Sequence, residues 1–417
     1  MMADFTISAV EANKGADKDL WRQAREKELE QLKQYEVYEE LDEIPTGKQT
    51  IDTKWVYRIK HNPDGSKKFK ARLTGRGFTQ LPGLHYDRTD APTARAETWR
   101  TIAILALSKQ WIIHQYDVVA AYLQATVNHD IYIKDPAVTG NKVWRLIKAL
   151  YGLKQSAREW NLEITGLLIQ AGLRQCISDP ASFYSENVML ALHIDDFLIA
   201  ASSIEAEAAI LNGIKEAVEL EYRGKPEKFL GTTWSWVENE IIIDSSDAIY
   251  KLSEAHTFTP GATTPLTTDH DLTAAQSDDE MADLAQYQSV IGSLLYIARM
   301  TRPDILFATT ALGKHCSRPA VRHWMATMRV ISYLARTANF GIALRGTDCP
   351  AVSVVSDASY APQGARSHTG ITTMLGSSHV AWSSKQQGLV TLSSAEAEYV
   401  AISAAAQDAL WIAGLLH

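Results

Sequence analysis

The feature that most constrains the fold is an apolar stretch at residues 188–201 that contains two adjacent carboxylates, Asp195 and Asp196. An ionised carboxylate is costly to bury in apolar surroundings unless a cation neutralises it. With the residues that precede it, the pattern predicts two strands over residues 182–201 that meet in a tight turn at Ile194, Asp195 and Asp196. Two interpretations of the pair stay open. Asp is a good residue for a solvent-exposed turn, and hard divalent cations such as Mg2+ prefer carboxylate oxygens.

A third candidate carboxylate, Asp117, ends a predicted strand at residues 111–118 and is followed by small residues and then by Tyr122. If this strand neighbours the hairpin, Asp117 completes a set of three carboxylates. Such a set can hold two divalent cations for in-line phosphoryl transfer.

Charge is distributed unevenly along the chain. The net charge is −8, yet basic side chains greatly outnumber acidic ones between residues 48 and 80, where alternating apolar residues predict a β-hairpin. A basic module on an acidic body suits contact with a polyanion at one place. A merely solvated basic hairpin fits the charge equally well.

Cysteine spacing and hydropathy exclude other classes. The three cysteines lack any CxxC spacing, so neither a zinc knuckle nor a disulfide framework is expected. No apolar stretch is long enough to span a membrane. We therefore expect a reducing, intracellular compartment and no membrane partner.

Several short motifs occur together in a fixed order along the chain. They lie at residues 54–56, 70–73, 117–123, 149–155, 194–196, 229–231, 301–304 and 382–387. This ordered set closely resembles the reverse transcriptase of copia-type LTR retrotransposons, and the resemblance extends from about Trp21 to His417. One departure is His193, which replaces the tyrosine that the family has before the aspartate pair.

The resemblance implies an α+β, multidomain protein built as a right-hand polymerase. Residues 17–202 would form the fingers and palm, and residues 203–255 a thumb-like region with a primer-grip hairpin. Residues 256–345 would form a linker and a helical connection. Residues 346–417 would form a ribonuclease H-like α/β domain that is incomplete at its C-terminus. Within these regions the pattern predicts a helix over 203–220 and a last helix over 394–416.

The resemblance also implies roles for individual residues at the polymerase site. Asp117, Asp195 and Asp196 would be catalytic and would hold two Mg2+ or Mn2+ ions. Tyr122 would exclude a ribose 2′-hydroxyl, although an ordinary core aromatic remains an alternative. Other residues would bind the nucleotide or the primer: Lys54, Lys70, Arg72, Gly152 and Gln155 for the nucleotide, and Phe229, Leu230 and Gly231 for the primer grip. The basic residues among them could instead bind template phosphates nonspecifically.

A second set of carboxylates lies near the C-terminus. Asp357 ends an apolar strand, and Glu398 lies in the first turns of the last helix, where Ser393 and Glu396 form a capping box. Asp357 and Glu398 match the first two metal ligands of ribonuclease H. Family members have further acidic ligands beyond this helix, so we expect little ribonuclease H activity from this chain.

The expected partners are an RNA template, a DNA or RNA primer and dNTPs, while the oligomeric state stays open. The expected location is the cytoplasm, in a virus-like particle, or the nucleus. Two other functions remain open: a catalytically decayed remnant that still binds nucleic acid, and a domesticated interaction protein. The presence of all three aspartates favours the enzyme.

Overall fold

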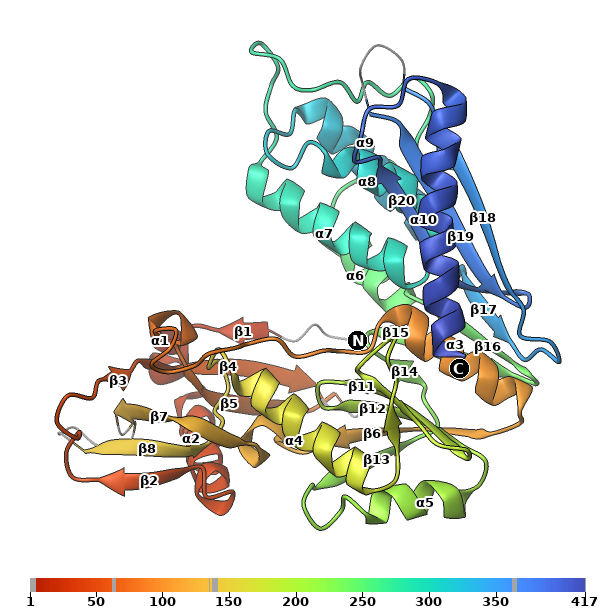
Figure 1. Cartoon of the computed structure of the whole chain (residues 1–417). Coiled ribbons are helices and arrows are strands. Elements are labelled where there is room, and N and C mark those ends of the chain that lie inside the picture. The colour runs from red at the N-terminus through yellow and green to blue at the C-terminus, as the bar shows by residue number, and fades with distance from the viewer. Residues whose placement is uncertain (1–4, 62–64, 135, 137–141, 362–365, 417) are drawn as a thin grey trace.

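The computed structural model describes residues 5–61, 65–134, 136, 142–361 and 366–416. Figure 1 shows two halves that meet at helix α3 (Ala96–Ser108). The lower half contains the N-terminal sheets and a central sheet. The upper half contains the remaining helices, α6 to α10 within residues 246–415, and a C-terminal sheet.

The central sheet contains the predicted turn at residues 194–195, but residues 182–201 form three strands instead of two, because a further turn separates Tyr184 from Val188. Its strand order is β13-β6-β12-β11-β10-β9, and all neighbours are antiparallel. The strands are β6 (Ile112–Val118), β9 (Arg174–Gln175), β10 (Ser182–Tyr184), β11 (Val188–His193), β12 (Asp196–Ala201) and β13 (Leu220–Gly224).

Both faces of the central sheet are covered, which explains why its middle strands are continuously apolar. Helices α4 (Ser156–Gln170) and α5 (Ile204–Asn212) cover one face, where Trp160 and Ile210 pack on Leu190 and Phe197. Helix α3 covers the other face.

The helix predicted over residues 203–220 is shorter than expected. Helix α5 ends at Asn212, because the residues after it form turns and then the edge strand β13.

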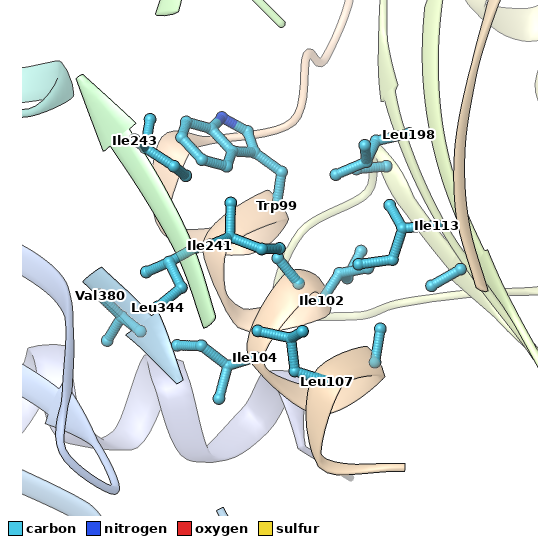
Figure 2. Packing of buried hydrophobic residues seen from close by; sticks show 14 of the residues in the cluster. Trp99, Ile102, Ile104, Leu107, Ile113, Leu198, Ile241, Ile243, Leu344 and Val380 are labelled. Carbon is cyan, nitrogen blue, oxygen red and sulfur yellow. The ribbon is translucent and has the colours of Figure 1, made fainter. Parts of the chain in front are cut away.

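Helix α3 is buried on nearly all sides and packs against strands of both halves of the molecule. Figure 2 shows Ile102 of this helix near Ile113 and Leu198 of the central sheet. On its other side the same cluster includes Ile241 and Leu344. One continuous core therefore joins the lower half to the upper half.

The N-terminal region holds the basic hairpin, formed by β4 (Thr53–His61) and β5 (Lys67–Gly75), together with β1 (Phe5–Ile7). Most of the predicted turn, residues 62–64, lies outside the described residues. Helices α1 (Ala9–Lys14) and α2 (Lys18–Gln34) pack against the hairpin. A second sheet, which was not predicted, has the order β2-β8-β7-β3. Its strands are β2 (Tyr38–Leu41), β3 (Thr50–Ile51), β7 (Thr126–Lys134) and β8 (Val143–Lys148).

A further sheet joins segments that are distant in sequence. Its order is β14-β15-β16-β17, and β17 (Gly341–Arg345) follows the helical region that the sequence predicted as the connection. The other strands are β14 (Lys228–Phe229), β15 (Thr232–Val237) and β16 (Glu240–Asp244). The helices between β16 and β17 are α6 (Ser246–Ala255), α7 (Leu284–Met300), α8 (Leu306–Gly313) and α9 (Val321–Arg336), and they share their own apolar core.

The C-terminal sheet is a three-stranded meander in the order β18-β19-β20, covered by helix α10 (Ser394–Leu415). Its strands are β18 (Val352–Ser359), β19 (His368–Leu375) and β20 (Ser378–Gln386). Among the described residues, no helix is both long and apolar enough to cross a membrane.

Candidate functional site

The fold brings the three predicted aspartates to one end of the central sheet. His193 pairs with Asp196, so β11 and β12 are joined by a two-residue turn that contains Asp195. Asp196 in turn pairs with Asp117 across β12 and β6. The Val118 amide donates to the Asp195 carbonyl at 2.8 Å. Strand pairing and this hydrogen bond therefore fix all three residues beside one another.

The turn itself has a strained backbone, and a hydrogen bond from helix α4 stabilises it. Ile194 has φ +60°, which is rare for a β-branched residue. Such a conformation costs on the order of 1–3 kcal/mol and persists only where the surroundings enforce it. Here the indole Nε1 of Trp160, on α4, donates to the Ile194 carbonyl at 2.6 Å. The position of Asp195 is thus set by packing rather than by the turn alone.

The surroundings of Asp195 and Asp196 disfavour the charged forms of these two carboxyls. Burial raises the pKa of Asp195, and Asp117 raises it further. Burial also raises the pKa of Asp196, followed by the charge of Asp195. Partial compensation comes from Gln115, whose Nε2 donates to Asp196 Oδ1 at 3.2 Å, and from Arg223, whose Nη2 lies 3.6 Å from Asp117 Oδ2. The site is therefore an anionic centre that lacks a full complement of positive charge.

These oxygen donors suit a hard divalent cation by their chemistry. Within the described part of the chain, however, no three His, Cys, Asp or Glu side chains are gathered closely enough to hold a metal ion as they stand. Two of the three aspartates make other contacts, since Asp117 contacts Arg223 and Asp196 accepts from Gln115. The three residues fit the cation by the chemistry of their oxygen donors.

Tyr122 lies beside this centre. It belongs to the short 3-10 helix Ala121–Gln124, which begins after Ala120 with φ +52°. Burial raises the pKa of Tyr122, and the charge of Asp195 adds to this. Its ring meets that of Tyr151 edge-on at 5.6 Å, and the Arg72 guanidinium lies 4.6 Å from the Tyr151 ring centre. Tyr151 was not predicted as a site residue, although it directly precedes the predicted Gly152.

The basic residues of the hairpin share one face. Lys54 pairs with Thr74, and Arg72 and Lys70 follow at alternate positions along β5, so all three side chains leave the same side of the ribbon. Burial lowers the pKa of Lys70 to about 8, and the charge of Arg72 contributes. A face of this kind gains free energy when a polyanion arrives, because the mutual repulsion of its cations is relieved.

Gly152 contacts the end of the basic hairpin, and Gln155 contacts the loop that follows it. Gly152 has φ +83°, and a Cβ there would lie 2.4 Å from the Gly75 carbonyl oxygen. Gln155 is only 1% exposed; it donates to the His85 carbonyl at 2.9 Å and accepts from Gln80 at 2.9 Å. Gln155 thus positions the loop at residues 76–86 through one donated and one accepted hydrogen bond.

Two residues that the sequence analysis missed line a pocket of about 450 Å3 next to this loop. Phe78 is 76% exposed, and Arg76 lies beside it with Lys54 and Lys154. An exposed aromatic ring among cations is typical of surfaces that bind single-stranded nucleic acid. The signal was present in the sequence as an aromatic residue inside the basic segment.

The residues predicted to grip a primer lie at the β14–β15 hairpin. Leu230 and Gly231 form its two-residue turn with φ +47° and +77°, as a type I′ turn requires. The Tyr296 hydroxyl donates to the Leu230 carbonyl at 2.7 Å, and a Cβ on Gly231 would lie 2.3 Å from that hydroxyl. Phe229 is 1% exposed within the core around Trp99, so it anchors the hairpin.

Asp357 and Glu398 lie on different elements of the C-terminal domain, Asp357 on strand β18 and Glu398 on helix α10. Gln387 donates both to Thr369 on β19 and to the Ala397 carbonyl on α10, so α10 covers the face that carries Thr369. Asp357 pairs with Gly370, the next residue, and therefore leaves the opposite face. The Ser393 hydroxyl accepts from the Glu396 amide at 3.1 Å, as the predicted capping box requires, but the carboxylate of Glu396 accepts from the Leu392 amide at 2.6 Å rather than from that of Ser393. The metal-binding roles of Asp357 and Glu398 remain predictions.

A carboxylate-bearing hairpin in a central sheet, facing a basic β-ribbon, defines the class of right-hand polymerase folds. The chain belongs to the family described as reverse transcriptase (RNA-dependent DNA polymerase), whose model matches residues 35–268. It is 30% identical, over 95% of its length, to the retrovirus-related Pol polyprotein from transposon RE2 of Arabidopsis thaliana. It is also 29% identical, over 96% of its length, to that from transposon TNT 1-94 of Nicotiana tabacum. The predicted resemblance to copia-type elements is thereby confirmed.

The chain spans 28% of the RE2 polyprotein and 32% of the TNT 1-94 polyprotein. A putative transposon Ty5-1 protein of Saccharomyces cerevisiae is matched over 98% of its own length and 69% of this chain, at 30% identity. Among solved structures, the foamy viral protease-reverse transcriptase in complex with dsDNA has a TM-score of 0.52 at 12% identity, over 93% of this chain and 71% of that one. This likeness confirms the predicted multidomain α+β polymerase fold.

Proposed function

We propose that this chain is an RNA-directed DNA polymerase of a copia-type retrotransposon that transfers nucleotides with the help of two divalent cations. One observation carries the proposal: Asp117, Asp195 and Asp196 are held together at the end of β6 and β12, beside Tyr122. The proposed partners are an RNA template, a DNA or RNA primer and dNTPs. The proposed place of action is inside the cell, in line with relatives that are transposon Pol polyproteins.

The three aspartates would hold the cations, with Asp117 and Asp195 making the larger contribution. When bound, Mg2+ or Mn2+ supplies a Lewis acid for the primer 3′-hydroxyl and neutralises charge on the triphosphate. The hairpin face that carries Lys54, Lys70 and Arg72 binds the triphosphate through its cations. The nucleotide then lies between the hairpin and the aspartates.

Primer extension on an RNA template tests the proposal directly. The wild-type chain should extend a labelled DNA primer with dNTPs in Mg2+ or Mn2+, and EDTA should stop the reaction. Asp117→Asn removes one anionic ligand and should lower extension by about 10^3-fold, as the loss of a group that acts on the reacting atoms does. If neither metal supports extension by folded wild-type protein, the chain is a decayed or domesticated nucleic-acid-binding remnant.

Tyr122 is expected to guard the sugar of the incoming nucleotide. Tyr122→Ala opens space beside Asp195 and should raise the ratio of rNTP to dNTP incorporation by about tenfold or more, which corresponds to roughly 1.4 kcal/mol of lost discrimination. Competition assays with both nucleotides measure this ratio. Tyr122→Phe keeps the ring and serves as the control, with an expected ratio near that of wild type. An unchanged ratio in Tyr122→Ala would assign the ring to packing against Tyr151.

The C-terminal domain is expected not to cleave RNA in a hybrid. Asp357 lies on strand β18 and Glu398 on helix α10, and two carboxylates of a larger ligand set would leave a second cation poorly bound. A labelled RNA–DNA hybrid, shown to be cleavable by an active ribonuclease H, should stay intact with this chain. Specific cleavage that disappears in Asp357→Asn would contradict the expectation.

A further inference from the structure

Arg223 occupies a special position in β13, next to the aspartate centre. Tyr222 pairs with Tyr116 and Gly224 pairs with Gln115, so Arg223 is the extra residue of a β-bulge. Gly224 accommodates the bulge with φ +79°. Bulges of this kind redirect a side chain and occur often next to active sites. The guanidinium of Arg223 is thereby directed to the end of the sheet where Asp117 lies.

Two carboxylates compete for this guanidinium. Its Nη2 lies 2.8 Å from Glu221 Oε2 and 3.6 Å from Asp117 Oδ2. Glu221 is the direct cross-strand partner of Asp117, so the two acids share a face of the sheet. Arg223 is 46% exposed and Glu221 51% exposed, whereas Asp117 is 31% exposed. The arginine therefore contacts both acids at once, and its shorter contact is with the more solvated one, Glu221.

We propose that Arg223 is an internal counter-cation that competes with divalent metal for Asp117, and that Glu221 holds Arg223 when the metal binds. This inference rests on the proposed function of the aspartates. Without metal, the guanidinium offsets part of the repulsion among Asp117, Asp195 and Asp196. With metal, it gives up the contact with Asp117 and keeps the one with Glu221, at 2.8 Å. Arg223 thus sets the metal concentration at which the site fills, and it acts as a positioning residue.

Population arithmetic gives the size of the effect. The apparent affinity for metal is reduced by the fraction of molecules in which Asp117 is available. An exposed ion pair contributes little free energy, so its loss should change the affinity for metal by only about two- to fivefold. Arg223→Gln should therefore bind metal about two- to fivefold more tightly. Glu221→Gln removes the alternative partner and should bind metal more weakly by a similar factor.

Mn2+ binding to the whole chain, followed by electron paramagnetic resonance of the free ion, tests this without any catalytic turnover. If Glu221 acts through Arg223, Glu221→Gln should lose most of its effect when introduced into Arg223→Gln. Arg345→Gln is the matched control, because Arg345 is 48% exposed and pairs with Glu240 in a different sheet. It should leave Mn2+ affinity unchanged. Melting curves of each variant verify the fold.

The outcomes separate this inference from the proposed function. Tighter binding in Arg223→Gln, with loss of binding in Asp117→Asn, supports both. Unchanged or weaker binding in folded Arg223→Gln, while Asp117→Asn still loses binding, overturns the role of Arg223 and leaves the aspartate site intact. Equal Mn2+ binding in wild type, Asp117→Asn and Asp195→Asn overturns the metal site and the role of Arg223 with it.

Discussion

Asp195→Asn is expected to lower primer extension by at least about 10^3-fold and at the same time to raise the melting temperature by about 1–2 °C. Activity falls because an anionic ligand beside Asp117 and Asp196 is lost. Stability rises because burial and like charge already raise the pKa of Asp195, so its ionised form is unfavourable in the folded chain. Sites that are strained for function commonly show this opposition.

The sign of the pH dependence follows from linkage. A carboxyl whose folded pKa is raised costs stability when it is ionised, and the cost disappears as the pH falls through that raised pKa. The stability advantage of Asp195→Asn should therefore be largest near neutral pH and should shrink in acid. Thermal unfolding at several pH values measures it.

Asp130→Asn is the control, because the pKa of Asp130 is shifted in the opposite direction to that of Asp195. Lys48 at 2.9 Å and Arg145 at 3.2 Å hold the pKa of Asp130 below its usual value, and the side chain is 42% exposed. Its substitution should slightly lower the melting temperature and leave extension unchanged. If Asp195→Asn kept full activity, the assignment of the aspartate centre would be wrong, whatever its stability.

Arg100→Met is expected to produce the largest loss of stability. Arg100 is 1% exposed and donates to the carbonyls of Val380 at 2.9 Å, Arg299 at 2.8 Å and Met300 at 2.6 Å. Its guanidinium also lies 4.2 Å from the Trp382 ring centre. One side chain on α3 therefore ties the end of α7 and strand β20 to the lower half.

Methionine fills a similar volume but leaves those buried carbonyls without a donor. The expected cost is about 3–5 kcal/mol, from several unsatisfied acceptors together. Limited proteolysis should then release the C-terminal sheet before the central sheet unfolds. Arg100→Lys keeps the charge but not the fork of donors and should lose less. Arg336→Met, at an exposed position on α9, is the control and should change stability by less than about 0.5 kcal/mol. A melting profile of Arg100→Met like that of wild type would contradict this role.

Sequence patterns predicted those parts of the fold whose residues carry a strong local signal. The hairpin at residues 188–201 and the last helix were predicted because apolar periodicity and capping residues specify them locally. The sheet formed by β2, β3, β7 and β8 was missed. Its short strands come from three separate segments, and only tertiary pairing identifies them as partners.

The residues of the candidate site were likewise predicted only in part from the sequence. The three aspartates could be identified from their motifs, and strand pairing brings them together. Gln155 was expected against the nucleotide, but its burial depends on a distant loop that the sequence does not place. Arg223 carried no signal, because the bulge that directs it depends on pairing with β6.

The pairing of β16 with β17 has a topological consequence. Asp244 is directly opposite Gly341, so the chain leaves one strand and returns to the next at almost the same point. Cross-strand Cα atoms are only about 5 Å apart. Helices α6 to α9 are therefore an insertion whose two ends meet like those of a closed loop. Strand pairing therefore holds the two ends of the helical module together independently of the packing among its helices, as a short turn does in a β-hairpin.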